Sequence, residues 1–425
     1  MNKPFTLKGY WFLPNQEEQK IAGILSFEPG ENMRLELFGA ISQKSPEEYL
    51  RLIAENWDKN EIIPVIHGHT SDGKEFSLLN CIDGQSSLNF NAEFPLTSYI
   101  VNAAIQGILI TDYQEPVFNK IRVKLTQLHE WLGTIGFQQS YNFEDSSSNF
   151  GFKLPESVSF SISGDYDLSF NSGYEKYNVS RDELNIKQSS FVEIKIGSLV
   201  SYRKLGEQIF LFLDFLSLGT LSPIMIETMT VFNEEIDEDG KAYTNTSHVF
   251  YKSEQKSAKG LKKDHDFLFN YETISDVFEE IIKKWYTLDS EIRPIRQYLI
   301  ESVQPIGTFK TNHFLNIIQA LEGFHTRFRN KKMELKERLE DIVTEFSDVQ
   351  LVKNEFNDLE ETLNSAKDSR HYYSHFFKLK NNKTKHGVDL YHLTIKLRIL
   401  LVCCVLKEAG FTNAKINDIL VSGKL

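Results

Sequence analysis

The sequence has 425 residues, 59 acidic against 47 basic side chains, and a formal net charge of -12. At roughly 100–200 residues per domain, this length predicts two or three domains with real hydrophobic cores. An apolar content of 41% and a charged content of 25% exclude a disordered or fibrous chain. The acidic balance excludes a protein that coats nucleic acid or anionic membrane with its whole surface, but it leaves room for a local basic site.

The cysteine count and the apolar runs predict a cytoplasmic protein without a membrane span. Three cysteines are too few for a disulfide scaffold, and the odd number fits a reducing cytosol. Residues 1–14 show no long apolar run and no small-residue cleavage site, so we expect no signal peptide. The most apolar window, residues 208–226, contains Asp214 and Pro223, and we expect a buried helix followed by a loop or strand.

Residues 5 to about 200 carry the pattern of β structure. Short runs of β-branched and aromatic residues alternate with Gly, Pro, Asn and Asp, and strands spaced by roughly 10 residues predict a sandwich or a rolled antiparallel sheet. Two stretches differ: residues 45–57 predict a short helix, and residues 201–220 predict a helix that covers one face of the sheet. Residues 233–266 are acidic and then rich in lysine, and we expect a hairpin tip followed by a solvated linker there.

Past residue 273 the hydrophobic period becomes helical. One expected helix begins at Ser275 as its N-cap, and its apolar stripe comprises Val277, Ile281, Ile282, Trp285 and Leu288. The next stripe comprises Phe314, Ile317, Ile318, Leu321 and Phe324. The last long helix ends at Gly410, a natural residue just beyond a helix C-terminus, and Pro294 and Pro305 are expected between helices.

These patterns predict an α+β multidomain fold. We expect a β-rich N-terminal domain over residues 1–265, followed by an all-α helical bundle over residues 273–425.

Few residues outside the segment around Arg370 are candidates for chemistry. Cys403 and Cys404 are neighbours in an apolar helix and are expected in the core. His67 and His69 share one face of a predicted strand, where a metal pair is the alternative to a structural role.

The informative segment is residues 365–386, SAKDSRHYYSHFFKLKNNKTKH. Arg370 and His375 suit phosphodiester cleavage, because a guanidinium binds phosphate through two hydrogen bonds and an imidazole moves protons near neutral pH. RNA carries its own nucleophile, the 2′-OH, so neither a metal nor a protein nucleophile is required. The spacing itself is expected by chance in this composition. It recurs at Arg122 and His129, where we interpret it as structural.

The context of Arg370 favours the first pair. Between Lys367 and His386, six basic side chains stand against Asp368, which gives a local charge of +5 in a chain of net charge -12. The interleaved rings of Tyr372, Tyr373, Phe376 and Phe377 are suited either to stacking on bases or to packing. The six basic residues are Lys367, Arg370, Lys378, Lys380, Lys383 and Lys385.

RHYYSH, with a polar residue after the arginine, resembles the RxxxxH motif of HEPN ribonucleases, which are small dimerising helical bundles. The preceding NIIQALEGFHTRF resembles the ApeA-type branch of that superfamily. The N-terminal domain that accompanies this branch is similar to three stretches of this chain: LKGYWFLP…IAGILSFEPGENMRLELFGAI, ITDYQEPVFNKIRVKLTQLHEWLG and LGEQIFLFLDFLSLGT. The resemblance therefore covers both halves of the chain.

The resemblance implies an endoribonuclease of abortive-infection defence against phage, which cuts RNA, with tRNA as the suggested substrate. It implies that the N-terminal domain senses a phage trigger, such as a phage protein, and that the bundle forms a homodimer or higher homo-oligomer without a metal or other cofactor. By the same resemblance Arg370 would clamp the scissile phosphate, His375 would act as general acid and base, and His371 would assist. Supporting roles fall to Asp368, Glu322 and Tyr373, and RNA binding to Lys378, Lys380, Lys383 and Lys385.

Several alternatives remain open from the sequence. Positions five residues apart on a helix point about 140° apart, so Arg370 and His375 are not expected to share a helix face. Either the arginine sits at a helix end or a dimer partner completes the pair. His371 and His375 at a spacing of four are an alternative metal pair, and Glu322 and His325 either face the cleft or pack between helices. Asp368 either orients an imidazole or caps the next helix.

Two other functions compete with the nuclease. The first is a catalytically inactive HEPN bundle that binds RNA or protein. The second is a toxin restrained by its sensing domain, for which deletion of residues 1–265 should raise toxicity.

Overall fold

The computed structural model describes residues 3–41, 62–84, 96–144, 146–236, 242–252, 266–303, 309–376 and 383–423. Five of the predictions fall outside these ranges. They are the helix over residues 45–57, residues 253–265 of the solvated linker, the position of Pro305, the ring of Phe377, and the RNA-binding residues Lys378 and Lys380.

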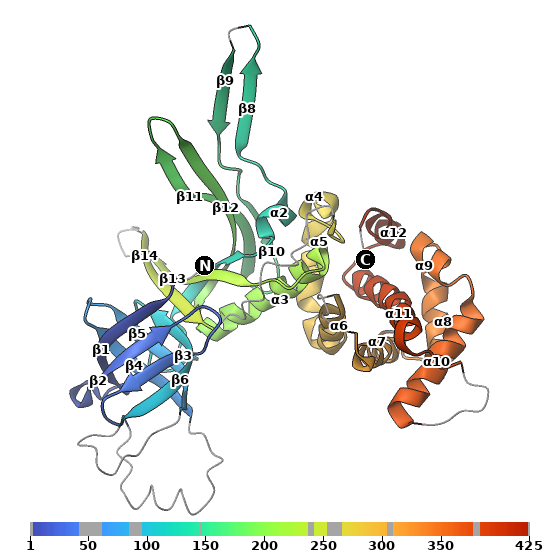
Figure 1. Ribbon diagram of the computed structural model, residues 1–425, viewed down its shortest axis with the longest axis horizontal. Helices are drawn as coiled ribbons and strands as arrows, with labels where there is room; N and C mark the ends of the chain where they lie inside the picture. Colours follow the sequence, from blue (N-terminus) through green and yellow to red (C-terminus); the bar gives the residue numbers. More distant parts are fainter. Residues whose placement is uncertain are drawn as a thin grey trace, which may run out of the picture.

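The first six strands close into an antiparallel barrel (Figure 1). Closure follows because the sixth strand pairs with both the third and the fifth. A rolled antiparallel sheet is therefore confirmed for this part of the chain. Gly68 permits the close packing of the barrel interior, since a Cβ there would lie 2.2 Å from the ring of buried Trp11. The strands are β1 (Phe5–Phe12), β2 (Ile21–Phe27), β3 (Met33–Leu37), β4 (Ile62–Thr70), β5 (Glu75–Asp83) and β6 (Thr97–Gln106), with a short 3-10 turn at Glu17–Gln19.

The barrel continues through β6 into a second antiparallel sheet. Its order from β6 outward is β14 (Ala242–Tyr251), β13 (Ile226–Ile236), β7 (Phe118–Leu125), β12 (Leu184–Val200), β11 (Tyr166–Val179) and β10 (Val158–Ser161). β13 and β14 form the hairpin expected within residues 233–266, but their pairing extends to Ile236 and Ala242. Residues 242–251 lie in the stretch predicted as a hairpin tip and a solvated linker, but they form a full strand, in which Thr, Val and aromatic residues alternate.

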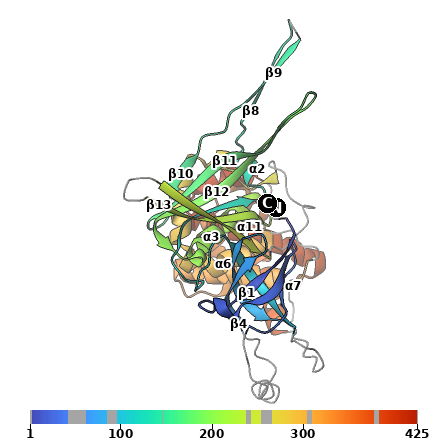
Figure 2. The ribbon, with the colours of Figure 1, turned by 90° about the vertical axis from the view of Figure 1, so that its left-hand side faces the viewer.

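Helix α3 (Tyr202–Thr220) covers one face of this sheet, against β7 and β12. It begins where Ser201 accepts a hydrogen bond from the Lys204 amide at 3.4 Å, so the helix predicted over residues 201–220 is confirmed. The short helix α2 (Leu128–Leu132) packs beside it. A separate hairpin, β8 (Phe137–Asn142) with β9 (Ser147–Phe152), extends away from the body in both views (Figures 1 and 2).

The C-terminal region is helical, as predicted. Its elements are α4 (Tyr271–Ile274), α5 (Phe278–Thr287), α6 (Asp289–Val303), α7 (Thr311–Phe324), a π-helical turn (His325–Arg329), α8 (Leu335–Glu345), α9 (Gln350–Glu355), α10 (Leu359–His375), α11 (Gly387–Glu408) and α12 (Asn413–Ser422). The α7 stripe from Phe314 to Phe324 is buried, and Gly410 follows the end of α11 with a φ of 109°.

Two helix boundaries differ from the prediction. Asn270 and Thr273 form a capping box, so α4 begins earlier and Ser275 follows its end instead of opening α5. Pro294 lies inside α6 and not between helices. A proline is tolerated there because the carbonyl it leaves unpaired belongs to the exposed Ser290, which water can reach.

The bundle and α3 share one continuous hydrophobic core. The Trp285 indole donates to the Leu211 carbonyl at 2.9 Å, and the Tyr286 hydroxyl donates to the Gln208 carbonyl at 2.8 Å. Buried Arg296 of α6 joins Asp214 of α3, at 2.9 Å. Thus α3 contacts the sheet on one side and the bundle on the other (Figure 1).

Within the described part of the chain, none of the helices combines the length and the hydropathy that crossing a membrane would require.

All three cysteines are expected to resist alkylation in the native protein. Cys81, Cys403 and Cys404 are buried, and burial raises the pKa of Cys403 to about 12. At pH 8 the reactive thiolate is therefore scarce as well as shielded. Mass spectrometry after iodoacetamide treatment should show no adduct before unfolding and three adducts in denaturant, and rapid labelling of the native protein would contradict this.

Candidate active site

The RHYYSH segment forms the C-terminal end of α10. Asp358 caps the start of this helix by accepting from the Glu361 amide, and Leu363, Ala366 and Ser369 bury one face. The helix ends at His375 because Phe376 turns into the left-handed region, with a φ of 56°.

Arg370 and His375 are in contact within one chain. The Arg370 Nη1 lies 3.1 Å from the His375 Nε2. The prediction that the two residues cannot share a helix face is therefore wrong as a statement about their side chains. The 140° angle separates their Cα–Cβ directions, but an arginine is long enough to reach around the helix to a histidine in its last position.

Glu322 of α7 approaches the same guanidinium from a neighbouring helix. Its Oε2 lies 3.5 Å from the Arg370 Nη2. The arrangement places an acidic, a cationic and an imidazole group together at a partly exposed surface. Because a guanidinium only donates hydrogen bonds, the acceptor in this contact is the His375 Nε2.

His371 and Tyr373 flank this contact differently. The rings of His371 and His375 lie 6.3 Å apart, centre to centre. The Tyr373 hydroxyl lies 2.7 Å from the His386 Nδ1 and 3.2 Å from the Lys385 carbonyl, and burial raises the pKa of Tyr373. The hydroxyl therefore connects α10 to the segment that precedes α11.

That segment, residues 383–386, is hydrogen-bonded to side chains of α10. The Asp368 carboxylate accepts from the Lys383 amide at 2.9 Å, and the Ser369 hydroxyl accepts from the Lys385 amide at 3.0 Å. Asp368 thus binds the backbone that leads into α11 and is not seen to orient an imidazole. The Lys385 ammonium lies 3.5 Å from a Glu361 carboxylate oxygen.

His386 is a neighbour of the site that the sequence pattern does not predict. Its ring lies 5.3 Å from the Tyr372 ring and 5.8 Å from the Tyr373 ring. The sequence does show a histidine at the end of the lysine-rich run. Its contact with α10 arises because the chain folds back along that helix, and hydrophobic periodicity does not predict such a path.

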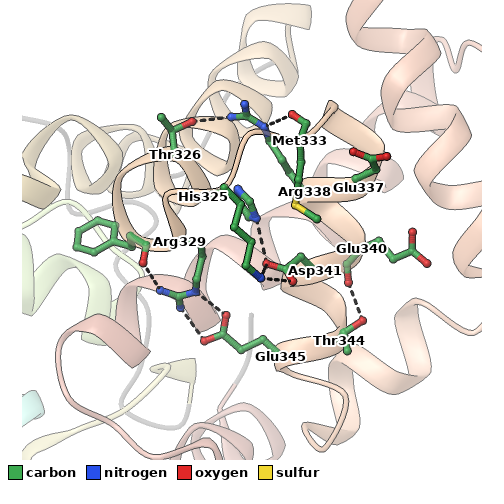
Figure 3. A network of polar contacts seen from close by, with 12 residues as sticks. His325, Thr326, Arg329, Met333, Glu337, Arg338, Glu340, Asp341, Thr344 and Glu345 are labelled. Carbon is green, nitrogen blue, oxygen red and sulfur yellow. Dashed lines mark hydrogen bonds and ion pairs between the residues drawn. The ribbon is translucent and has the colours of Figure 1, made fainter.

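A polar network joins the π-helical turn that follows α7 to α8 (Figure 3). The Arg338 guanidinium donates to the Glu322 carbonyl at 3.3 Å and to the Met333 carbonyl at 2.7 Å. His325 is buried with its Nε2 3.0 Å from Asp341, so it packs between helices. Further along the π-helical turn, Arg329 donates to both carboxylate oxygens of Glu345.

Replacing Asp341 by asparagine is expected to destabilise the protein at pH 7 and to lose this effect in acid. The Lys331 ammonium lowers the pKa of Asp341; partial burial opposes this shift, and the bond to His325 adds to it. A lowered folded-state pKa stabilises the fold above the unfolded value of about 3.9 and ceases to do so as the pH falls through the folded value. Denaturant unfolding from pH 7 to pH 3 measures this difference. Glu340→Gln, at an exposed position on the same helix, is the control, and a difference from wild type that stays constant with pH would contradict the linkage.

The alternative sites do not assemble. His67 is buried with its Nε2 2.8 Å from the Ile110 carbonyl, and within the described ranges no three His, Cys, Asp or Glu side chains gather as metal ligands. The second Arg–His pair, Arg122 and His129, does not form a comparable site, because each residue contacts a different partner. Arg122 donates to Glu193, and His129 lies 3.0 Å from the Ser190 hydroxyl.

Comparison with known families identifies both halves. Residues 6–285 match the family described as ApeA N-terminal domain 1, and residues 315–415 match the family described as Apea-like HEPN. The chain therefore belongs to the ApeA family of HEPN-domain proteins, which act in defence against phage. Neither the search of curated proteins nor the search of solved structures gave a match. The first match includes α4 and most of α5, whereas the domain division at residues 265–273 remains a prediction.

Proposed function

We propose that this protein is a metal-independent endoribonuclease that cuts RNA, with tRNA as the expected substrate, to arrest growth during phage infection. The contact of Arg370 with His375 at 3.1 Å carries the proposal. It joins a phosphate-binding cation to a group that can accept a proton, in a domain whose family consists generally of ribonucleases.

The proposed reaction uses the substrate as its own nucleophile. Arg370 binds the scissile phosphate and stabilises its developing charge, and His375 accepts the proton of the 2′-OH. The 2′-oxygen attacks phosphorus in line while the bond to the 5′-oxygen breaks, and that oxygen takes a proton from a second imidazole, for which His371 is the nearby candidate. The products are a 2′,3′-cyclic phosphate and a 5′-hydroxyl. A second copy is expected to contribute its own motif to a shared cleft.

The N-terminal domain is proposed to sense a phage trigger, such as a phage protein, in the cytoplasm. Support comes from the continuous packing that leads from the sheet through α3 and α6 to α7. A trigger that shifts α3 would act on the helix that carries Glu322, and Glu322 competes with phosphate for Arg370.

The chemistry of the RNA ends tests the nuclease proposal. Purified full-length protein should cut total tRNA in the presence of EDTA and leave 5′-hydroxyl and 2′,3′-cyclic phosphate ends. Mapping of cellular RNA with and without infection should show the same ends. Absence of cleavage under both conditions, together with retained RNA binding, would favour the inactive module, a function that the ion pair of Arg370 with Glu322 also supports.

Lys383 and Lys385 are expected to contribute affinity without sequence preference. Replacing either lysine by alanine removes one cation from the phosphate backbone. The change should weaken RNA binding uniformly across sequences and reduce the slope of log affinity against log salt by about 0.7–1 per residue. Fluorescence anisotropy with two unrelated RNAs between 50 and 200 mM salt, roughly the range where such contacts are measured, gives both quantities. Lys20→Ala, on the N-terminal barrel, is the control. An unchanged slope of log affinity against log salt would show that these lysines do not contact RNA phosphates.

A further inference from the structure

The β8–β9 hairpin has two chemically different faces. Its register pairs Phe137 with Phe152, Gln139 with Phe150 and Tyr141 with Ser148, which places the four aromatic rings on one face. The opposite face is formed by small and amide side chains: Gln138, Ser140, Asn142, Ser147, Asn149 and Gly151.

The aromatic face is exposed in the single chain. The side chains of Phe137, Tyr141 and Phe150 are 44%, 49% and 67% exposed, and Phe143 at the turn is 86% exposed. The hairpin pairs with no other described strand and projects clear of the body in both views (Figures 1 and 2). An isolated two-stranded hairpin is only marginally stable in water, and three or more strands or a packing partner are needed for independent stability.

The base of the hairpin is held firmly. The Gln188 side chain of β12 accepts from the Gly136 amide at 2.8 Å and donates to the Thr134 carbonyl at 3.2 Å. The aromatic face is therefore presented at a defined position by the main sheet, as an interaction surface would be.

We propose that this aromatic face packs against the same face of a second copy of the chain. Neither β8 nor β9 contains a charged residue, so two identical faces meet without like-charge repulsion. Between residues 137 and 152 the only charged residues are Glu144 and Asp145, so the surface offers no cation to the phosphates of RNA or of anionic lipids.

The apolar area matches a dimer contact. The exposed parts of Phe137, Tyr141 and Phe150, together with the turn residue Phe143, whose ring lies 4.7 Å from that of Tyr141, amount to about two and a half aromatic side chains, or on the order of 500 Å² per copy at about 200 Å² per ring. A pair would bury about 1,000 Å² from the rings alone, and the intervening backbone would bring this near the ~1,200 Å² lower bound for a specific interface. Since the patch is the same on both copies, a two-fold contact closes without further growth.

Sedimentation velocity of the full chain over a range of concentrations tests the proposal. Phe150→Ser removes two rings from each dimer and is expected to weaken self-association at least about tenfold. At a concentration between the two dissociation constants, the average mass should therefore fall toward half that of wild type. Asn149→Ser, at the neighbouring position on the polar face, should leave the mass unchanged. The variants share any contact between HEPN domains, so the difference between their association constants reports the hairpin contact alone. RNA cleavage by the same variants reports separately on the proposed nuclease.

A crosslinking pair gives an independent measurement. With all three native thiols buried, Gln139→Cys on the aromatic face should be joined between copies by a short bis-maleimide, whereas Ser140→Cys on the polar face should not. Equal crosslinking of both variants, or equal masses of wild type and Phe150→Ser at every concentration, would overturn the proposal. It would also be overturned if Phe150→Ser lost binding to phosphatidylcholine vesicles or to another protein without any change in self-association.

Discussion

Replacing Arg370 by alanine is expected to lower the rate of RNA cleavage about 10²–10³-fold, because it removes a donor aimed at the charge that develops on the phosphate. Arg370→Lys keeps the positive charge but loses the two-pronged geometry that reaches both phosphate and His375, so it should recover only a small part of the rate. Cleavage of labelled tRNA by purified protein, and growth arrest on expression, measure the effect.

The controls for Arg370 separate catalysis from folding. His375→Ala should lower the rate comparably, since the two side chains act through one contact. His248→Ala, at an exposed strand position in the N-terminal domain, should cleave like wild type. Full cleavage by both Arg370→Ala and His375→Ala would show that the proposed nuclease does not use this site.

Replacing Arg296 by alanine is expected to lower the free energy of unfolding by about 3–5 kcal/mol, as for other buried ion pairs that lose one member. Its guanidinium bonds Asp214 of α3 at 2.9 Å and Asp289 of α6 at 2.7 Å. Burial raises the pKa of Asp214, an effect that Arg296 partly offsets, so the variant leaves that carboxylate poorly solvated and without its cation. Denaturant unfolding of the full chain provides the measurement.

Arg293 offers a matched control on the same helix. It also pairs with Asp289, but its side chain is 60% exposed and water can replace its contacts. Arg293→Ala should therefore cost at most about 1 kcal/mol. If the two arginine variants unfold at the same denaturant concentration, then the α3–α6 ion pair is not a major contributor to stability.

The elements predicted correctly from the sequence are those fixed by local patterns. The helix over residues 201–220, the apolar stripe of α7 and the terminating Gly410 each depend on residues a few positions apart. The family resemblance depends on longer stretches of both halves and is confirmed by the two family matches.

The features that sequence patterns do not predict depend on contacts between distant segments. Closure of the barrel requires β6 to pair with both β3 and β5, and no periodicity encodes that choice. The strands β8 and β9 lack the β-branched runs typical of the other strands. The angular spacing of an ideal helix also predicts wrongly that the side chains of Arg370 and His375 stay apart. It takes no account of the length of an arginine side chain or of the position of His375 at the end of α10.

The hydrophobic core around α3 is continuous between the two halves, so we expect them to unfold as one cooperative unit. Trp285 and Tyr286 bond to carbonyls of α3, and Arg296 needs Asp214 of the same helix. Removal of residues 1–265 would strip away this helix, expose the apolar surface beneath it and leave a buried cation half-paired. A truncated bundle that proved inert would therefore report a loss of folding, and restraint by the N-terminal half has to be examined in the intact chain.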